Sequence, residues 1–424
     1  MVKLSTLYKY TVIVCCLLSL GLLLLTPREY IGTYVQRMMI FILAMLLSAR
    51  LLMIKDYSLY KSTKFVNNYS ICFFIGLTIV AKHSIDLYGY SNLFIFKMLL
   101  PYFFVLLAYP LIYIFLRDKE VFKFLNIVLI VVIFMMIIRF VSWFLYNYSG
   151  KIVFPRLLFQ YDVWIRDGFQ RMDTGGLFGI ALVLSSVQAL TRRNKWLYFS
   201  IVAFCIFFVA FVTRVRFQFM LAIFVFMVIY LSNQIFFKKS PLKKLLIYFG
   251  VFFALLFLGQ WIISFLEYAL FSNRYVASTS VRLEGINHYW KLMLNKHSIL
   301  GLGFMYPSYP NVEILMMRNP WSIYYLDDLG LLGTFFQMGI FVLVTHGYLF
   351  YKTINVTIRS FKYADKQDFL FLLGLTIYII VSNILLNTFD IQRLFELPFY
   401  LAIISYYDGR LANNNFNNSV MSGL

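Results

Sequence analysis

The chain has 424 residues, of which 62% are hydrophobic, 20% aromatic and only 13% charged. A soluble domain cannot hide that much apolar side chain from water, so the composition predicts an integral membrane protein. Lys and Arg outnumber Asp and Glu by 38 to 18, which gives a net charge of +20. In a soluble protein this excess would indicate nucleic acid. In a membrane protein it is typical of cytoplasmic loops, and we expect no nucleic-acid partner.

Long, mostly apolar runs recur along the sequence, and a helix of about 20 such residues crosses a bilayer. The runs cover residues 10–25, 38–54, 65–81, 93–116, 121–146, 176–190, 196–212, 217–237, 245–266, 326–351, 369–386 and 394–407. The first is followed by Thr26-Pro27-Arg28 rather than a small-residue cleavage site, so we interpret it as an uncleaved anchor. The sequence predicts an all-α, polytopic transmembrane helix bundle of about twelve spans, with residues 1–424 as a single integral membrane domain.

Basic residues predict the orientation, because short cytoplasmic loops retain Lys and Arg. These residues concentrate in alternate loops, for example Lys61 and Lys64 after the second span. We therefore expect both termini to lie in the cytoplasm, with the protein in a bacterial cytoplasmic (inner) membrane. Two long segments, about 147–175 and 267–325, then emerge on the outer face, where function should concentrate.

Two arginines flank the first outer segment. Arg139 lies within the fifth span, about two turns from its outer end, and can extend outward to the interface. Arg171 precedes Asp173-Thr174-Gly175-Gly176, where the chain re-enters the membrane and glycines permit a close approach of a ligand. Because this segment contains three Arg and three Asp, pairing within the loop is the alternative for Arg171.

Arg214 and Arg216 lie in a short turn between two spans, and no acidic residue occurs between Asp173 and Glu267. Charged groups at membrane depth are costly and normally face a partner or a cavity. Their planar guanidinium groups suit phosphate oxygens, and a helix N-terminus would add anion affinity. The alternative is that both extend to lipid phosphates.

The second outer segment predicts an amphipathic helix over 281–296, with Ser280 as its N-cap. Its expected apolar face consists of Leu283, Ile286, Trp290, Met293 and Leu294. Its polar face carries Glu284, His288 and Lys291, close to Arg282. This face either forms salt bridges in water or directs Arg282 toward Arg214 or Arg216.

Asp327 and Asp328 open the predicted tenth span. One of two carboxylates in a partly dry site can have a raised pKa and act as a base. Alternatively, both stabilise the positive end of a helix.

The order of four segments resembles the O-antigen polymerase and ligase family of polytopic bacterial membrane enzymes. These segments are 171–176 before a span, 213–216 in a tight turn, 282–304 from Arg282 through Trp290 to Gly301-Leu302-Gly303-Phe304, and 324–333 containing Asp328-Leu329-Gly330. The resemblance implies inverting glycosyl transfer between oligosaccharides on a polyprenyl pyrophosphate carrier at the outer membrane face.

The resemblance also implies roles for individual residues. Arg214, Arg216 and Arg282, with Arg171, would bind the pyrophosphate, and Asp328 or His288 would accept the acceptor's proton. No cofactor and no metal ion is implied. The partners would be polyprenyl-pyrophosphate-linked oligosaccharide and membrane lipids, with a flippase and a chain-length regulator as candidate protein partners.

Two alternatives remain at this point. An O-antigen ligase commonly has a histidine shortly before the Tyr, acidic and Gly-Gly pattern, where this chain has Asn319-Pro320-Trp321-Ser322. A flippase for lipid-linked oligosaccharide would have short loops and cations along its spans. We therefore favour a polysaccharide polymerase, of the O-antigen, capsule or exopolysaccharide type, which joins repeat units to one another. The sequence specifies neither the sugars, the linkage nor the oligomeric state.

Overall fold

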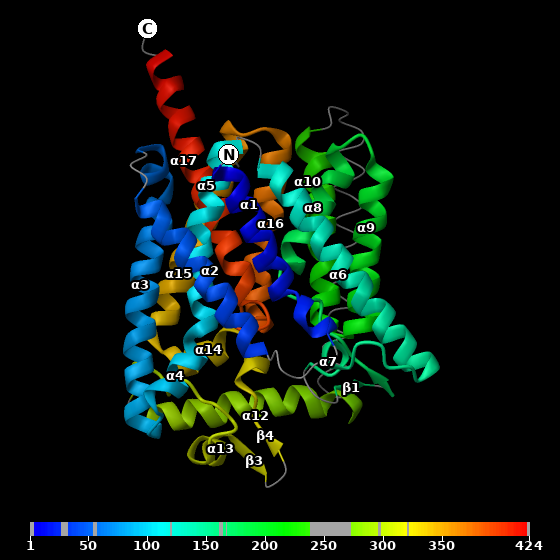
Figure 1. Cartoon of the computed structure of the whole chain (residues 1–424), viewed down its shortest axis with the longest axis vertical. Helices are drawn as coiled ribbons and strands as arrows, with labels where there is room; N and C mark the ends of the chain where they lie inside the picture. The colour runs from blue at the N-terminus through cyan, green and yellow to red at the C-terminus, as the bar shows by residue number, and fades with distance from the viewer. Residues whose placement is uncertain are drawn as a thin grey trace.

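The computed structural model of the chain describes residues 4–26, 33–53, 57–118, 121–160, 164–166, 168–237, 273–295, 298–319 and 322–421. Within these ranges the protein is a bundle of long helices (Figure 1). The predicted ninth span, 245–266, lies outside the described residues.

The first part of the chain extends across the bundle (Figure 1). Its elements are α1 (Leu4–Ser19), the 3-10 turn η1 (Leu22–Leu25), α2 (Thr33–Leu52), α3 (Tyr57–Tyr88), α4 (Asn92–Leu99), the 3-10 helix η2 (Leu100–Leu107), α5 (Ala108–Asp118), α6 (Val121–Ser149), α7 (Pro155–Leu158), β1 (Ile165–Arg166), β2 (Phe169–Gln170) and α8 (Phe178–Thr191). β1 and β2 pair antiparallel, with Ile165 opposite Gln170. Pro101 begins η2, where the helix tightens between α4 and α5.

The second part completes the bundle. Its elements are α9 (Lys195–Phe207), the π-helical turn η3 (Phe208–Thr213), α10 (Arg216–Phe237), α12 (Asn273–Asn295), α13 (Pro310–Met316), β3 (Met317–Asn319), β4 (Ser322–Ile323), the 3-10 turn η4 (Leu326–Leu329), α14 (Leu331–Met338), α15 (Ile340–Tyr363), α16 (Lys366–Leu385), the 3-10 turn η5 (Leu394–Glu396) and α17 (Leu397–Met421). β3 and β4 form a second antiparallel hairpin, with Asn319 opposite Ser322.

The bundle has two different ends (Figure 1). α1 begins and α17 finishes at one end, which we call the terminal end. At the other, the loop end, α12 runs across the bundle axis, and α7, β1, α13 and the β3–β4 hairpin lie beside it. The described parts of the two long segments predicted from the sequence therefore share one end of the molecule.

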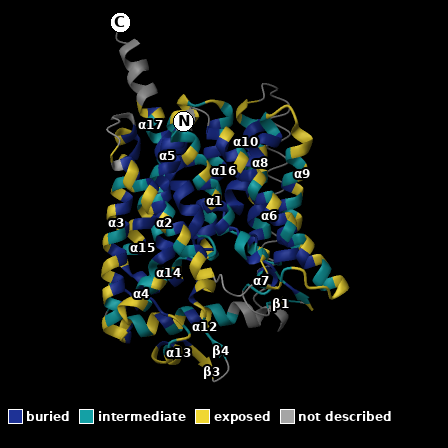
Figure 2. Cartoon of the chain, in the orientation of Figure 1, coloured by how far each residue is buried: buried dark blue, intermediate teal, exposed yellow. Residues whose placement is uncertain are grey.

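Seven helical stretches in the described ranges are long and apolar enough to cross a membrane. They are Thr33–Leu51, Leu59–Tyr88, Asn92–Arg117, Val121–Ser149, Lys195–Thr213, Arg216–Phe237 and Lys366–Leu385. Large apolar side chains such as Ile71, Ile130 and Leu343 are exposed on the outside of the bundle (Figure 2), as lipid-facing helices require. The predicted helical membrane bundle is therefore confirmed.

The predicted start of the tenth span is wrong. Instead of one helix from residue 326, the chain forms η4 and α14, and the long helix α15 begins only at Ile340. Gly330 and Gly339 adopt positive φ angles of 58° and 56° at the two breaks. A Cβ at Gly339 would lie 2.1 Å from the Ile299 carbonyl oxygen, so this break allows the 299–303 segment to pack against it.

The predicted amphipathic helix exists but is longer and oriented differently. α12 begins at Asn273, so Ser280 lies inside the helix and is not its N-cap. Tyr289 is fully buried, whereas Leu283, Trp290 and Leu294, predicted on the packed face, are 58%, 46% and 56% exposed. α12 crosses the end of the bundle and packs through Gly285 and Tyr289 together with Ile286 and Met293 of the predicted face, and the Trp290 ring lies 6.2 Å from that of Phe336. Leu283 and Leu294 remain exposed.

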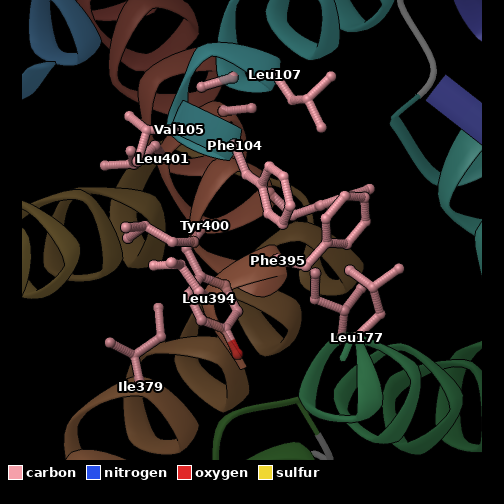
Figure 3. Close-up of a cluster of buried hydrophobic side chains, with 14 of the residues drawn as sticks. Phe104, Val105, Leu107, Leu177, Ile379, Leu394, Phe395, Tyr400 and Leu401 are labelled. Atoms are coloured by element: carbon pink, nitrogen blue, oxygen red, sulfur yellow. The ribbon is translucent and has the colours of Figure 1, made fainter. Parts of the chain in front are cut away.

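The packed centre joins elements that are distant in sequence (Figure 3). Phe104 of η2 contacts Phe395 of η5, with ring centroids 5.7 Å apart. Leu177, Ile379 and Leu401 are buried in the same cluster. The C-terminal helices therefore fill the middle of the bundle.

The start of α8 is capped by a side chain from far along the chain. Leu177 precedes this helix in a left-handed conformation, and no local side chain caps it. Instead, the Gly179 amide donates a 2.8 Å hydrogen bond to Oε1 of the buried Glu396, which also accepts from the Tyr400 hydroxyl. A carboxylate at a helix N-terminus satisfies a free N–H group and the helix dipole. This contact fixes α8 against the η5–α17 corner.

Gly179 gives the first prediction. A Cβ there would lie 2.1 Å from the Tyr378 ring of α16, whereas Gly347, on an exposed face of α15, has no heavy atom within 4 Å of that position. We expect Gly179→Ala to destabilise the protein by about 1 to 3 kcal/mol through overpacking. Gly347→Ala should be neutral or stabilise by about 0.5 to 1 kcal/mol. Thermal denaturation of the two purified variants measures the difference, and equal midpoints would contradict the packing.

Candidate functional site

The loop that joins α16 to α17, residues 386–396, brings a rigid polar turn into the bundle. Asn383 Oδ1 accepts a 2.9 Å hydrogen bond from the Thr388 amide, and Asn387 Oδ1 accepts one of 2.9 Å from the Phe389 amide. Asn387 Nδ2 also donates to the Gly330 carbonyl at 3.3 Å. These buried contacts hold the loop beside the η4–α14 corner, so that the charges that follow it have fixed positions.

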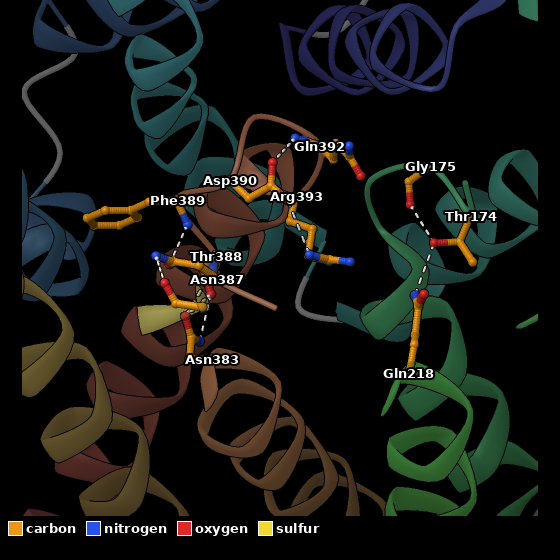
Figure 4. A network of polar contacts seen from close by, with 11 residues as sticks. Thr174, Gly175, Gln218, Asn383, Asn387, Thr388, Phe389, Asp390, Gln392 and Arg393 are labelled. Atoms are coloured by element: carbon orange, nitrogen blue, oxygen red, sulfur yellow. Dashed lines mark hydrogen bonds and ion pairs between the residues drawn. The ribbon is translucent and has the colours of Figure 1, made fainter. Parts of the chain in front are cut away.

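Asp390 and Arg393 form an ion pair within this loop. Arg393 Nη1 lies 3.3 Å from Asp390 Oδ2, and the two side chains are only 18% and 10% exposed. In Figure 4, Arg393 extends from its loop toward the side where Thr174 and Gly175 lie. Burial raises the pKa of Asp390, while the Arg393 guanidinium opposes this shift. The nearby carboxylates of Asp328 and Asp173 raise it further, so all three side chains belong to one electrostatic cluster.

Arg139 and Asp173 form a second pair. Arg139 is 1% exposed, its Nε lies 3.6 Å from Asp173 Oδ1, and its Nη2 donates to the Leu20 carbonyl at 2.9 Å. The interpretation that Arg139 extends to the interface is therefore wrong, because its carboxylate partner lies inside the protein. Gly175 makes room for this side chain, since a Cβ there would lie 2.2 Å from Arg139 Nη1.

Asp327 and Asp328 approach the cluster from η4. Asp327 is an exposed residue of η4. Desolvation by neighbouring protein atoms, together with the carboxylates of Asp390 and Asp328, raises the pKa of Asp327 to about 7, and Arg393 opposes the shift. A carboxyl group with that pKa exchanges protons near neutral pH, which makes Asp327 a stronger candidate base than Asp328.

We call Arg139, Asp173, Asp327, Asp328, Asp390 and Arg393 the charged cluster. It joins four parts of the chain: α6, the segment before α8, η4 and the α16–α17 loop. Two of these parts meet at Gly176, where a Cβ would lie at ordinary contact distance, 3.4 Å from Phe395 Cβ and 3.5 Å from the Gln392 carbonyl oxygen. Gln218 of α10 adds a further polar contact, a 3.2 Å hydrogen bond to Thr174 Oγ1 (Figure 4).

Arg171 and Arg214 lie in the same region of the structure, but both side chains donate hydrogen bonds to backbone oxygens. Arg171 Nε donates to the Thr213 carbonyl at 2.7 Å, and its guanidinium lies 3.7 Å from the centre of the Trp164 ring. Arg214 Nη1 donates to the Arg166 carbonyl at 3.0 Å and stacks 4.1 Å from the Phe169 ring. These contacts fasten the β1–β2 hairpin to the turn between α9 and α10.

That turn is tight, as the sequence predicts, and its conformation is unusual. Arg214 has a φ of 54°, in the left-handed region that non-glycine residues rarely adopt, and follows the π-helical turn η3. Its Nε donates to the Phe211 carbonyl at 3.1 Å. Hydrogen bonds from its charged side chain therefore offset the backbone strain.

Three other predicted site residues lie elsewhere at the loop end. Arg216, the first residue of α10, is exposed, and Arg282 is half-buried on α12. His288 is half-buried, with its Nε2 2.7 Å from the Leu315 carbonyl oxygen and its ring 5.1 Å from that of Tyr324. Because a carbonyl only accepts, His288 Nε2 carries the proton in this contact. Pyrophosphate binding by the arginines and proton transfer by His288 stay predictions.

Sequence reasoning missed Asp390 and Arg393 as site residues. Arg393 was visible as a rare cation in a loop on the outer side, with Asp390 three residues before it. Nothing in the sequence indicated that the 386–396 loop folds back beside residues 173–176 and 327–330.

In comparisons with known proteins, no protein-family model and no curated protein matches this chain. Function must therefore be argued from the charged cluster and its surroundings.

The contacts of Arg171 and Arg214 predict a structural role that can be separated from ligand binding. Arg171→Ala and Arg214→Ala each lose charged hydrogen bonds, which contribute about 1.5 to 3 kcal/mol each. We expect faster amide hydrogen exchange in residues 164–176 of both variants. Arg192→Ala, at an exposed position of the α8–α9 connection, should leave exchange in that segment unchanged. Wild-type exchange in all three variants would show that the two contacts do not hold the hairpin.

Proposed function

We propose that the protein is a polysaccharide polymerase of the O-antigen, capsule or exopolysaccharide type. It joins polyprenyl-pyrophosphate-linked oligosaccharide repeat units by inverting glycosyl transfer at the outer face of a bacterial cytoplasmic membrane. In this proposal about twelve spans cross the membrane, both termini are cytoplasmic, and the loop end faces outward.

The observation that carries the proposal is the charged cluster at the loop end. Ionisable groups within a membrane bundle are costly and mark substrate sites more often than structural ones. Here a guanidinium, Arg393, lies among the carboxylates of Asp390, Asp327 and Asp328. A cation for an anionic leaving group and a carboxylate that titrates near pH 7 are the two groups that such a transfer needs.

The reaction balances with these groups. A hydroxyl oxygen of the acceptor sugar attacks the anomeric carbon of the donor, and the bond from that carbon to the pyrophosphate oxygen breaks. Asp327, in its ionised form, accepts the hydroxyl proton. Arg393, with Arg216 and Arg282 as further candidates, stabilises the negative charge that develops on the departing polyprenyl pyrophosphate. In this scheme Arg171 and Arg214 hold the neighbouring hairpin and turn in place.

A flippase is the second candidate, and one observation favours it. Arg139 is a cation buried inside the bundle, as a translocation path for an anionic lipid would require. However, Arg139 is the only buried Lys or Arg among the residues that the structure describes, whereas a translocation path would need cations along several spans. We therefore favour the polymerase over the flippase.

A reconstitution experiment separates these functions. Purified protein in lipid vesicles receives polyprenyl-pyrophosphate repeat units alone, and the products are separated on a gel. A ladder of products identifies a polymerase, whereas unchanged repeat units would refute it. Arg393→Gln should lower ladder formation by about 100-fold, the effect typical of removing one group that stabilises developing charge. Arg410→Gln, at the terminal end, is the matched control and should retain the ladder.

The raised pKa of Asp327 predicts the pH dependence of transfer. A base must be ionised, so the rate should fall about tenfold per pH unit below pH 7 and level off above it. Asp327→Asn should lower the rate by about 100-fold or more and remove this dependence. Asp328→Asn serves as the neighbouring control. If Asp328→Asn abolishes transfer while Asp327→Asn does not, the proton acceptor is Asp328.

A further inference from the structure

A cavity of about 520 Å³ lies between α2, α3, η2 and α5, near the terminal end. Its walls include Met45, Leu51, Leu59 and Leu106, and its volume falls within the range of ligand pockets in proteins. Met45 and Tyr60, which also line it, are 43% and 70% exposed on the outer surface of the bundle. The cavity is therefore accessible from the side that lipid covers.

Among the polar residues that line this cavity, Asn67 has a side chain that can hydrogen-bond to a ligand. Ser48 and Thr63 satisfy their hydroxyl groups on backbone oxygens, Ser48 on Leu106 at 2.9 Å and Thr63 on Tyr60 at 3.1 Å. The half-buried Asn67 side chain has no hydrogen-bond partner among the described residues. Its amide group offers two donors to a ligand inside a mainly apolar space.

Basic residues are sequence neighbours of the residues that line this cavity. Arg50 lies between the lining residues Ala49 and Leu51 on α2, and Lys61 and Lys64 directly follow the lining residues Tyr60 and Thr63 on α3. All three cations are exposed. Asp56 is the only acidic residue of the sequence between Arg50 and Asp86. The stretch of chain around the cavity therefore carries a net positive charge.

We propose that this cavity is a binding site for one anionic glycerophospholipid. One acyl chain occupies the apolar space, an ester carbonyl accepts a hydrogen bond from Asn67, and the phosphate lies at Arg50, Lys61 and Lys64. Basic pockets between membrane helices recognise anionic lipid headgroups in this way. The site is at the opposite end from the charged cluster and does not depend on the proposed function.

Photo-crosslinking tests this proposal. The full-length protein is reconstituted in phosphatidylcholine vesicles that contain a small fraction of phosphatidylglycerol with a diazirine in its acyl chain. Crosslinks should map to α2, α3 and η2. Arg50→Gln, Lys61→Gln and Lys64→Gln should each weaken retention about fivefold, because one cation at an anionic surface contributes about that factor. Ala49→Trp, which fills the entrance, should abolish the crosslinks.

The matched control removes charge elsewhere at the terminal end. Arg192, Arg193 and Lys195 are exposed residues of the α8–α9 connection, and their Gln variants should crosslink as the wild type does. Equal labelling by diazirine phosphatidylcholine would overturn the headgroup argument. Crosslinks unaffected by Ala49→Trp would overturn the cavity. Displacement by unlabelled polyprenyl phosphate but not by unlabelled phosphatidylglycerol would assign the cavity to a carrier lipid and refute the proposal.

Discussion

The fold depends on one constraint: a charge within a membrane bundle needs a partner inside the protein, because lipid provides none. Arg139 meets it through Asp173 and the Leu20 carbonyl, Arg393 through Asp390, and Glu396 through the start of α8 and the hydroxyl of Tyr400. The contacts of Arg139 and the contact of Glu396 with α8 each join two segments, and the Arg393–Asp390 pair lies within the α16–α17 loop. The polar contacts that allow the bundle to form therefore also determine where its charges gather.

The C-terminal corner plays a particular part in this arrangement. The 386–396 loop is held by buried side-chain amides, it packs its Phe395 against Phe104, and it caps α8 through Glu396. A loop fixed in so many ways can hold Asp390 and Arg393 in one geometry, and preorganised charges stabilise a developing charge without rearranging. The rigidity of this corner thus supports the proposed chemistry as well as the fold.

Hydropathy predicted a helical bundle with several candidate membrane spans, because apolar length is dictated by the bilayer. It failed where backbone conformation determines the structure. Gly330 and Gly339 break the predicted tenth span, and α12 packs through Gly285 and Tyr289 as well as part of its predicted apolar face, while Leu283 and Leu294 stay exposed. Among candidate site residues, the sequence identified the Asp327–Asp328 pair. It could not identify Asp390 and Arg393 as their partners, since that requires knowing how the 386–396 loop folds back.

The prediction from sequence and the structure differ most clearly at Arg214. Arg214 lies in an interval without acidic residues, and from sequence this suggested an anionic ligand. In the structure, its guanidinium donates hydrogen bonds to the carbonyls of Phe211 and Arg166 and stacks on the ring of Phe169. Carbonyl oxygens at helix ends and in turns are acceptors that no count of charged residues includes. An isolated arginine in a membrane protein therefore indicates a ligand only if nearby backbone oxygens do not already bind its guanidinium. Arg393, whose partner is a carboxylate close to other acidic side chains, meets that condition better than Arg214 does.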